Sequence, residues 1–333
     1  MEKTRIAING FGRIGRLVLK ASIARSDLEI CAINDLTEPK ILAHLLKYDS
    51  THGRFPEEVY AEEETLLVGG NKISILNESD PSKLPWKKLK VDVVVESTGR
   101  FNDGTKADAH LKVGAGKVII SAPANNVDAM VVLGVNDSEL RNHPKMVSNA
   151  SCTTNCLALM VKVLHERFGV VSGMMNTIHS YTNDQRLLDL PHPDLRRARG
   201  AAVNMIPTTT GAAAAVGQVI PELKGKLDGL SIRVPTSNGS LTDFTGILDQ
   251  SVTVLEVNEA FRDAAAGNLK DYLEFSEEPL VLTDIVGNSA SCVFDALSTN
   301  VVNGNFVKVL GWYDNEWGYA NRCADLVSRL AAF

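Results

Sequence analysis

Three glycines with the spacing G-x-G-x-x-G near the start of the chain restrict its possible fold more than any other feature. They lie between a short apolar run and a segment suited to a helix, and a second apolar run follows and ends at an aspartate. Strand, glycine turn, helix, strand and acidic residue at this spacing predict a βαβ unit that binds a dinucleotide, because the glycines let the pyrophosphate approach the helix N-terminus. The parts of this unit are residues 5–9, Gly10, Gly12, Gly15, residues 16–20, residues 28–34 and Asp35.

The aspartate that ends the unit also indicates which dinucleotide binds. The carboxylate of Asp35 can accept hydrogen bonds from both ribose hydroxyls, but it would repel a 2′-phosphate. Leu36 beside it carries no positive charge that could attract such a phosphate. NAD is therefore favoured over NADP. The alternative is that Asp35 only caps a helix or forms a turn.

The remaining apolar runs predict an α/β chain of two domains. Near-continuous β-branched runs in the first half are typical of a mainly parallel sheet with both faces covered, and Ser121 follows one of them, where ligands bind in such sheets. Longer strands with few helices then predict a mostly antiparallel sheet. We expect a Rossmann-type NAD-binding domain at residues 1–151, an α+β catalytic and oligomerisation domain at residues 152–315, and a last helix at residues 316–333 that packs back on the first domain. The further strands expected in the first sheet are residues 92–96, 117–121 and 130–135.

Composition excludes several classes of partner. The 333-residue chain has a net charge of -6, which gives no electrostatic reason to expect nucleic acid or an anionic membrane as a partner. No apolar run approaches the roughly 20 residues of a membrane span, and no secretory signal is visible before the first strand. The five cysteines have no spacing typical of a metal site. We therefore expect free thiols, a reducing cytoplasm and no bound metal.

A second informative segment, Ser-Asn-Ala-Ser-Cys-Thr-Thr-Asn-Cys at residues 148–156, lies between a short apolar run and an apolar-periodic segment. This pattern predicts a strand, a tight turn and a helix with Cys152 in its first turn. Free backbone N–H groups and the helix dipole favour thiolate at such a position, so Cys152 is a candidate nucleophile. The alternative is a buried structural cysteine beside residues that merely cap the helix.

Two further groups of residues fit a cysteine nucleophile. His179 lies at the end of an alternating run, and its imidazole could act as the base, although the sequence cannot place it beside Cys152. The second group consists of Thr182, Asp184, Arg233 and residues 208–211; its hydroxyls and guanidinium form a plausible anion site, because arginine binds phosphate oxygens bidentately. Alternatively, the threonines at 208–210 cap the helix that follows them.

With these motifs identified, the chain resembles the phosphorylating glyceraldehyde-3-phosphate dehydrogenases of the NAD-dependent, bacterial type over essentially its whole length. The resemblance implies a cytoplasmic homotetramer of glycolysis and gluconeogenesis. Such enzymes convert D-glyceraldehyde 3-phosphate, inorganic phosphate and NAD to 1,3-bisphosphoglycerate and NADH through a cysteine thioester. The matching motifs are residues 7–16, 148–156, 179–182 and 312–316.

The resemblance also implies roles for single residues. Cys152 would be the nucleophile and His179 its activator. Residues that would contact NAD are Gly10, Gly12, Arg13, Ile14, Gly15, Asp35, Ser121 and Asn315, the last of them at the nicotinamide carboxamide. Residues that would hold the substrate phosphate are Thr182, Arg233 and Arg197. Residues that would line the site of the attacking phosphate are Ser151, Thr153, Thr210 and Gly211.

Four positions depart from the family pattern. Ser79 stands where an arginine is expected near the adenine, and Ala214 replaces a lysine near the anion site. Ser237 and Gly239 replace the usual proline and valine after Arg233. None of these changes removes a catalytic role. Two other functions stay open: an erythrose-4-phosphate dehydrogenase with the same cysteine and histidine, and a catalytically silent NAD-binding scaffold.

Overall fold

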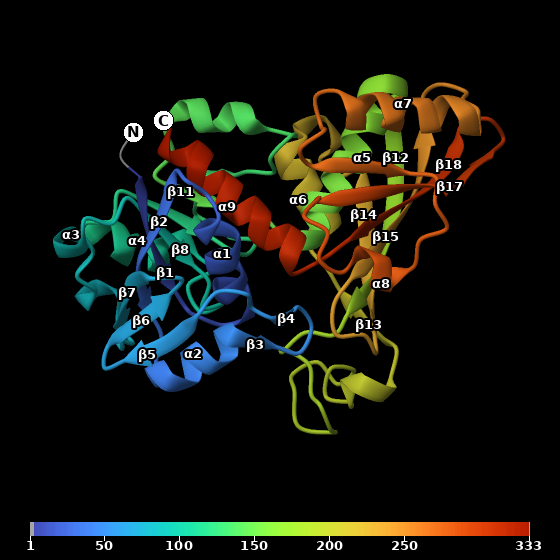
Figure 1. The fold of residues 1–333 in the computed structure, drawn as a ribbon. Coiled ribbons are helices and arrows are strands. Elements are labelled where there is room, and N and C mark those ends of the chain that lie inside the picture. The colour runs from blue at the N-terminus through green and yellow to red at the C-terminus, as the bar shows by residue number, and fades with distance from the viewer. Residues whose placement is uncertain (1–2, 333) are drawn as a thin grey trace. The chain divides into compact units, whose positions relative to one another are not determined.

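The computed structural model describes residues 3–332, which form two compact units (Figure 1). Unit 1 runs to Val131, resumes over Asp137–Ala150 and includes the chain from Ala320 onward. Unit 2 consists of Val132–Asn136 and Ser151–Tyr319. Each unit is built around its own sheet.

Unit 1 has a sheet of nine strands among the described residues, in the order β10-β11-β9-β8-β1-β2-β7-β6-β5. The pairs from β10 to β7 are parallel, and only β6 and β5 add antiparallel pairs at one edge. A mainly parallel sheet is therefore confirmed. The strands are β1 (Thr4–Asn9), β2 (Leu28–Asn34), β5 (Val59–Glu62), β6 (Thr65–Val68), β7 (Asn71–Leu76), β8 (Val93–Glu96), β9 (Lys117–Ile120), β10 (Ala129–Met130) and β11 (Met146–Ser148).

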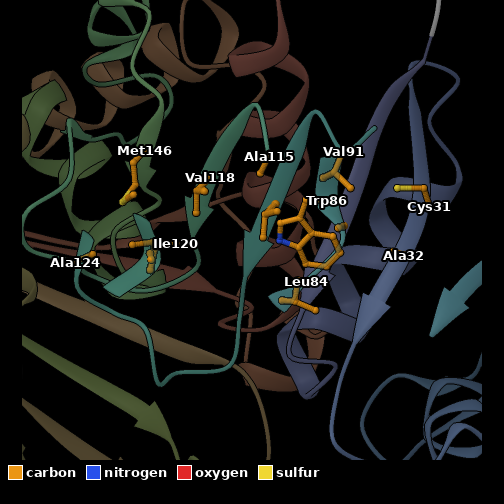
Figure 2. Packing of buried hydrophobic residues seen from close by; sticks show 13 residues of the cluster. Cys31, Ala32, Leu84, Trp86, Val91, Ala115, Val118, Ile120, Ala124 and Met146 are labelled. Carbon is orange, nitrogen blue, oxygen red and sulfur yellow. The ribbon is translucent and has the colours of Figure 1, made fainter. Parts of the chain in front are cut away.

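The helices of unit 1 flank this sheet, and a buried cluster around Trp86 forms part of the core. The Trp86 ring is fully buried and shares its cluster with Val118 and Ile120 of β9 (Figure 2). Its indole N–H is not orphaned, because it donates to Nδ1 of the equally buried His110 at 2.9 Å. The remaining elements are α1 (Arg13–Ile23), α2 (Pro39–Lys47), β3 (Tyr48–Asp49), β4 (Gly53–Arg54), η1 (Pro81–Lys83), α3 (Trp86–Leu89), α4 (Gly104–Lys112) and η2 (Asp137–Asn142); α9 (Trp317–Ala331) begins in unit 2 and continues into unit 1.

The strand expected at residues 130–135 is wrong beyond Met130. Only Ala129–Met130 pairs in the sheet, and the chain then turns. The backbone N–H of Val135 donates to the carbonyl of Val132, and Gly134 has a φ of 85°. A glycine with positive φ favours a turn, so the apolar run ends as buried turn residues rather than as a strand.

Unit 2 has a seven-stranded sheet among the described residues, in the order β13-β14-β12-β15-β18-β17-β16. Four of its six pairs are antiparallel, and the β12–β14 and β16–β17 pairs are parallel, which confirms a mostly antiparallel sheet. Its strands are β12 (Val170–Ser180), β13 (Ile206–Thr209), β14 (Leu227–Val234), β15 (Ser240–Leu248), β16 (Leu273–Ser276), β17 (Cys292–Val302) and β18 (Phe306–Tyr313). Its other elements are α5 (Cys152–Phe168), η3 (Ala201–Val203), α6 (Ala212–Val219), η4 (Pro221–Leu223), α7 (Val254–Ala266) and α8 (Leu282–Ile285).

The register of this sheet aligns four polar residues from four strands. His179 at the end of β12 pairs with Arg233 of β14 on one side and with Ser240 of β15 on the other. Ser240 in turn pairs with Tyr313 of β18. Residues far apart in the sequence thus form one row across the sheet.

Candidate active site

Helix α5 begins at Cys152, as the sequence predicts. Ser151 has an extended backbone, and its hydroxyl oxygen accepts a hydrogen bond from the N–H of Thr154, as in a helix N-cap. The Sγ atom of Cys152 lies 3.5 Å from Nε2 of His179. The structure therefore brings together the two residues that the sequence could not place side by side.

The imidazole of His179 is neutral at physiological pH. Burial and the neighbouring charge of Arg233 lower its pKa to about 3. The Nη1 atom of Arg233 lies 2.6 Å from Nδ1, and the carbonyl oxygen of Ser180 lies 2.7 Å from the same nitrogen. Nδ1 cannot serve both at once, because Arg233 can only donate and the carbonyl can only accept.

Two tautomers of His179 follow from this geometry. With the proton on Nδ1, the ring donates to Ser180 and presents the Nε2 lone pair to the thiol of Cys152, as a base requires. With Arg233 donating to Nδ1, the proton lies on Nε2 and can donate to the sulfur instead. The position of Arg233 therefore decides which tautomer faces the thiol.

Burial opposes the preference for thiolate that the sequence predicts at Cys152. The residue keeps part of its surface exposed, yet its sulfur is enclosed closely enough that burial raises the pKa of the thiol above its ordinary value. Arg233 and hydrogen bonds from Thr153 and the backbone oppose this rise without overcoming it. Burial therefore disfavours charge on both members of the Cys152–His179 pair.

Tyr313 is a site residue that the sequence reasoning did not assign. Its hydroxyl lies 2.8 Å from the hydroxyls of both Thr153 and Thr177, and its ring meets the His179 ring edge to face. Burial raises the pKa of the phenol far above its ordinary value, so it stays protonated. Tyr313 thus ties the first turn of α5 to the strand that carries His179.

Two serine hydroxyls hold the amide of Asn315. Its Oδ1 atom accepts hydrogen bonds from the hydroxyls of Ser180 at 3.0 Å and Ser240 at 2.8 Å. With Oδ1 engaged by both hydroxyls, Nδ2 is the atom of this amide left to donate to another group. Ser240 carries no sequence signal of its own; only its pairing with His179 and Tyr313 reveals it.

The glycine turn of unit 1 has the close backbone approaches that its motif requires. Gly10 has a φ of 91°, and a Cβ atom there would lie 2.6 Å from the backbone nitrogen of Thr98. A Cβ on Gly15 would lie 2.2 Å from the carbonyl oxygen of Gly10, whereas nothing lies within 4 Å of one on Gly12. Gly12 is therefore the open position, at the N-terminus of α1, where a pyrophosphate could approach. The two residues that follow it, Arg13 and Ile14, form the first turn of α1.

A cavity of about 270 Å³ lies beside this turn. Asp35 lines it, with Oδ2 accepting from the N–H of Phe11 at 2.7 Å and Oδ1 from that of Thr37 at 2.9 Å. These bonds hold the carboxylate at the strand end and leave lone pairs for ribose hydroxyls. Ser79, one of the departures, lines the same cavity, and Ser121 follows directly after β9.

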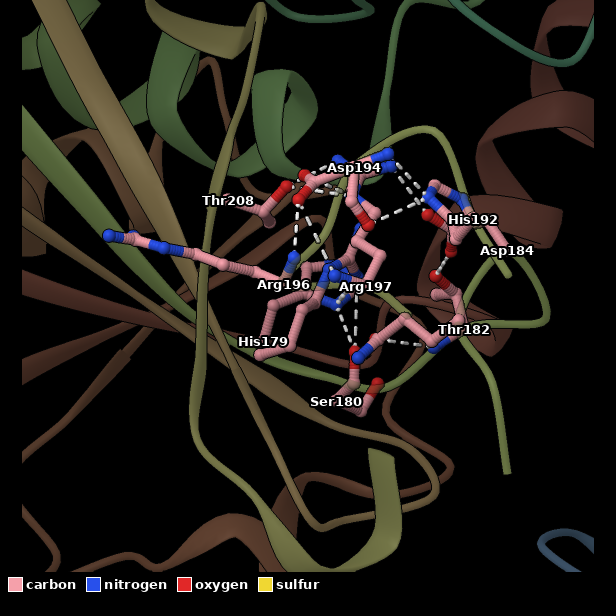
Figure 3. A network of polar contacts seen from close by, with 11 residues as sticks. His179, Ser180, Thr182, Asp184, His192, Asp194, Arg196, Arg197 and Thr208 are labelled. Atoms are coloured by element: carbon pink, nitrogen blue, oxygen red, sulfur yellow. Dashed lines mark hydrogen bonds and ion pairs between the residues drawn. The ribbon is translucent and has the colours of Figure 1, made fainter. Parts of the chain in front are cut away.

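The groups expected at the substrate phosphate already have partners within unit 2. The hydroxyl of Thr182 donates to Asp184, and Nη1 of Arg197 donates to the same carboxylate at 2.6 Å (Figure 3). Arg197 also donates to the hydroxyl of Thr208. Asp184 therefore links two of the three expected phosphate ligands.

Of the four residues expected around the attacking phosphate, Ser151, Thr210 and Gly211 lie at helix N-termini, and Thr153 bonds to Tyr313. The hydroxyl of Thr210 accepts from the N–H of Ala212, and Gly211 stands at the N-cap of α6. Of the other departures, Ala214 is exposed on α6 and Ser237 is exposed. Gly239 has a φ of 86°, a conformation that a valine would strain.

Within residues 3–332, no group of three or more His, Cys, Asp or Glu side chains could hold a metal ion. Over the same residues, no helix has both the length and the apolar character needed to cross a membrane.

Comparison with known proteins identifies the family. A model of the glyceraldehyde 3-phosphate dehydrogenase NAD binding domain matches residues 4–104, and a model of the C-terminal domain of the same enzyme matches residues 151–315. The chain belongs to the glyceraldehyde-3-phosphate dehydrogenase family. NAD is accordingly its cofactor.

Curated members of the glyceraldehyde-3-phosphate dehydrogenase family align with almost the full chain. Glyceraldehyde-3-phosphate dehydrogenase 1 of Bacillus cereus is 59% identical, and the alignment covers 99% of both chains. The glyceraldehyde-3-phosphate dehydrogenase of Geobacillus stearothermophilus is 56% identical, and that of Thermotoga maritima is 57% identical, each over 98% of both chains.

Proposed function

We propose that this chain oxidises D-glyceraldehyde 3-phosphate, with NAD and inorganic phosphate, to 1,3-bisphosphoglycerate, as a glycolytic and gluconeogenic dehydrogenase. The observation that carries the proposal is the 3.5 Å contact of Cys152 Sγ with Nε2 of a neutral, buried His179 at the start of α5. A thiol with a neighbouring base is the arrangement needed to add to an aldehyde and later hold an acyl group.

The chemistry begins with proton transfer inside this pair. Nε2 of His179 takes the thiol proton as the sulfur of Cys152 bonds to the aldehyde carbon, and it returns this proton to the carbonyl oxygen, which becomes the hydroxyl of a hemithioacetal. The imidazole then takes the hydroxyl proton as the carbonyl re-forms and a hydride leaves the carbon. NAD, when bound, supplies the acceptor for that hydride. Inorganic phosphate then attacks the thioester carbon, the carbon–sulfur bond breaks, and Cys152 leaves as a thiolate that takes back the proton held on His179. The released product is an acyl phosphate.

A phosphate group on Arg233 would improve the base. Burial and the charge of Arg233 hold the pKa of His179 near 3, where an imidazole is a weak acceptor of protons. A bound anion would counter the guanidinium charge and draw it away from Nδ1, which restores the tautomer with the Nε2 lone pair free. Substrate binding would thus prepare the residue that acts in the next step.

The residues present fit NAD. Gly12 leaves space for the pyrophosphate, Asp35 offers acceptors to a ribose, and Nδ2 of Asn315 is a donor held ready for the carboxamide oxygen. We assign NAD binding to residues 1–151 with the last helix, 316–333, and catalysis to residues 152–315.

The direct test is NADH formation from glyceraldehyde 3-phosphate with and without inorganic phosphate, followed at 340 nm. We expect phosphate-dependent turnover in the wild type and none in Cys152→Ala. His179→Asn should slow turnover by about 10²-fold or more, because the proton acceptor is lost. Phosphate-independent NADH formation with erythrose 4-phosphate as the better substrate would contradict the proposal, and full activity in Cys152→Ala would refute the mechanism.

We also propose that the protein is a homotetramer. One hollow of about 580 Å³ on the sheet of unit 2 is lined by apolar side chains that a monomer leaves exposed, among them Met174, Ile247 and Phe306. The segment from Tyr181 to Ala202 adds Leu187, Leu188 and Leu195 at 74 to 82% exposure. Exposed apolar side chains gathered on one face are typical of contacts between subunits. All five cysteines are free, which supports a cytoplasmic location.

A further inference from the structure

The carboxylate of Asp184 accepts hydrogen bonds from two residues that the proposed function assigns to the substrate phosphate. Its Oδ1 accepts from the Thr182 hydroxyl, and its Oδ2 accepts from Nη1 of Arg197 at 2.6 Å (Figure 3). An anionic carboxylate with two oxygens is in this respect a small substitute for a phosphate, which would use the same two donors.

Arg233 provides an independent sign that an anion binds nearby. Its Nε atom is buried and has no hydrogen-bond partner among residues 3–332, while its Nη1 atom contacts only Nδ1 of His179 and the carbonyl of Ser180. Buried donors of a charged group are rarely left without an acceptor. The guanidinium therefore has bonding capacity that the protein itself does not use.

The negative charge of Asp184 also acts on His179, which contacts Arg233. It raises the pKa of His179, opposing the effects of burial and of Arg233. A phosphate dianion bound to Thr182 and Arg197 would lie against this carboxylate, and two like charges so close repel each other. The side chain of Asp184 is 39% exposed, so it can rotate into solvent when a stronger anion arrives.

We propose that Asp184 is a built-in competitor of the substrate phosphate. Its carboxylate holds Thr182 and Arg197 in the resting enzyme, and the phosphate group must displace it. This inference rests on the proposed function, because it takes these two residues and Arg233 as the phosphate ligands. It makes Asp184 a specificity-determining residue: a dianion displaces the carboxylate, whereas singly charged anions and uncharged substrates do not.

The test compares two substitutions that remove the same charge from the same segment. Asp184→Asn keeps the shape of the side chain but weakens its hold on Thr182 and Arg197. Asp189→Asn is the matched control, since Asp189 pairs with Arg199 at 2.9 Å on the exposed surface and contacts none of the phosphate ligands. Binding of inorganic phosphate to each full-length protein is measured by titration calorimetry.

We expect phosphate to bind Asp184→Asn about fivefold more tightly than the wild type, or better, since an ion pair that must be broken has been removed. Asp184→Ala should shift the affinity in the same direction, and Asp189→Asn should not shift it. Unchanged or weaker phosphate binding in Asp184→Asn overturns the proposal, as does equal tightening in the control.

Kinetics give a second readout that a general structural defect would not produce. The ratio of kcat/KM for glyceraldehyde 3-phosphate to that for glyceraldehyde should rise in Asp184→Asn by a similar factor, because only the first substrate carries the displacing phosphate. A ratio that is unchanged or falls overturns the proposal.

The variant Arg233→Gln distinguishes a failure of the competitor role of Asp184 from a failure of the proposed phosphate site. If this variant loses phosphate affinity while Asp184→Asn gains none, the competitor role is wrong and the proposed substrate site stands. If Arg233→Gln binds phosphate as the wild type does, the proposed phosphate site is wrong, and the role of Asp184 falls with it.

Discussion

Two neighbours, Arg233 and the carbonyl of Ser180, determine the protonation and the tautomer of His179. Burial and Arg233 keep its imidazole neutral, and the choice between Arg233 and the Ser180 carbonyl sets its tautomer. Burial lowers the pKa of His179 but raises the pKa of the Cys152 thiol. Burial thus opposes charge on both residues.

The lowered pKa of His179 predicts a pH dependence of stability. The ordinary value is 6.5 and the folded value is about 3, so between these limits the unfolded chain binds a proton that the folded chain does not. Stability should therefore fall as the pH falls through this window, by up to about 1.4 kcal/mol per pH unit from this group alone. The measurement is the urea midpoint of unfolding at pH 7, 6, 5 and 4.

A variant isolates the contribution of this histidine. His179→Asn has no proton to gain at this position, so its midpoint should fall less steeply with acid than that of the wild type. His44→Asn, an exposed substitution on α2, serves as the control and should follow the wild-type slope. Parallel slopes for wild type and His179→Asn would show that the imidazole is protonated in the folded protein.

At the scale of elements, local signals predicted local structure well. The start of α5 at Cys152 follows from Ser151, whose hydroxyl caps the helix, and the turn before α1 follows from its glycines. The row of His179, Arg233 and Ser240 could not be predicted in this way. It depends on the register of β12, β14 and β15, which contacts between distant parts of the chain determine.

Two expectations from the sequence need correction, each for its own reason. The run at residues 130–135 is as apolar as a strand, but Gly134 turns the chain after Met130. The thiolate expected at Cys152 came from the helix start alone, and the burial that opposes it arises only when the sheet and α5 pack together. The sequence indicated that the helix start lowers the pKa of the Cys152 thiol, but it could not show that burial raises this pKa.

The glycine turn before α1 allows a paired prediction. In Gly12→Ala the new methyl has open space and an ordinary φ, so the fold should persist while NAD binds about tenfold or more weakly, since the methyl would lie where the pyrophosphate approaches. In Gly15→Ala the methyl would lie 2.2 Å from the carbonyl oxygen of Gly10, so the turn itself must move. Titration of NAD into each variant, with thermal unfolding alongside, distinguishes the two effects. Loss of folding in Gly12→Ala, or normal NAD binding by it, would contradict this explanation.

For the whole molecule, the exposed apolar side chains of unit 2 bear on assembly. Met174 is 58% exposed on β12 and shares its hollow with Ile247 of β15 and Phe306 of β18. Side chains of this kind on one face of a sheet are poorly matched to water, and a second copy of the chain would remove them from it. The proposed homotetramer gives these side chains a partner surface.

Met174→Glu tests this use of the sheet. A glutamate in a contact between subunits would bury a charge without a partner, which costs several kcal/mol, so the tetramer should dissociate into smaller species at micromolar concentration. Leu255→Glu is the control, because Leu255 on α7 is 65% exposed and does not line this hollow. Sedimentation velocity should show the smaller species only for Met174→Glu. A tetramer that survives this substitution would mean that the sheet of unit 2 faces solvent in the assembly, and a wild type that sediments as a monomer would refute the tetramer itself.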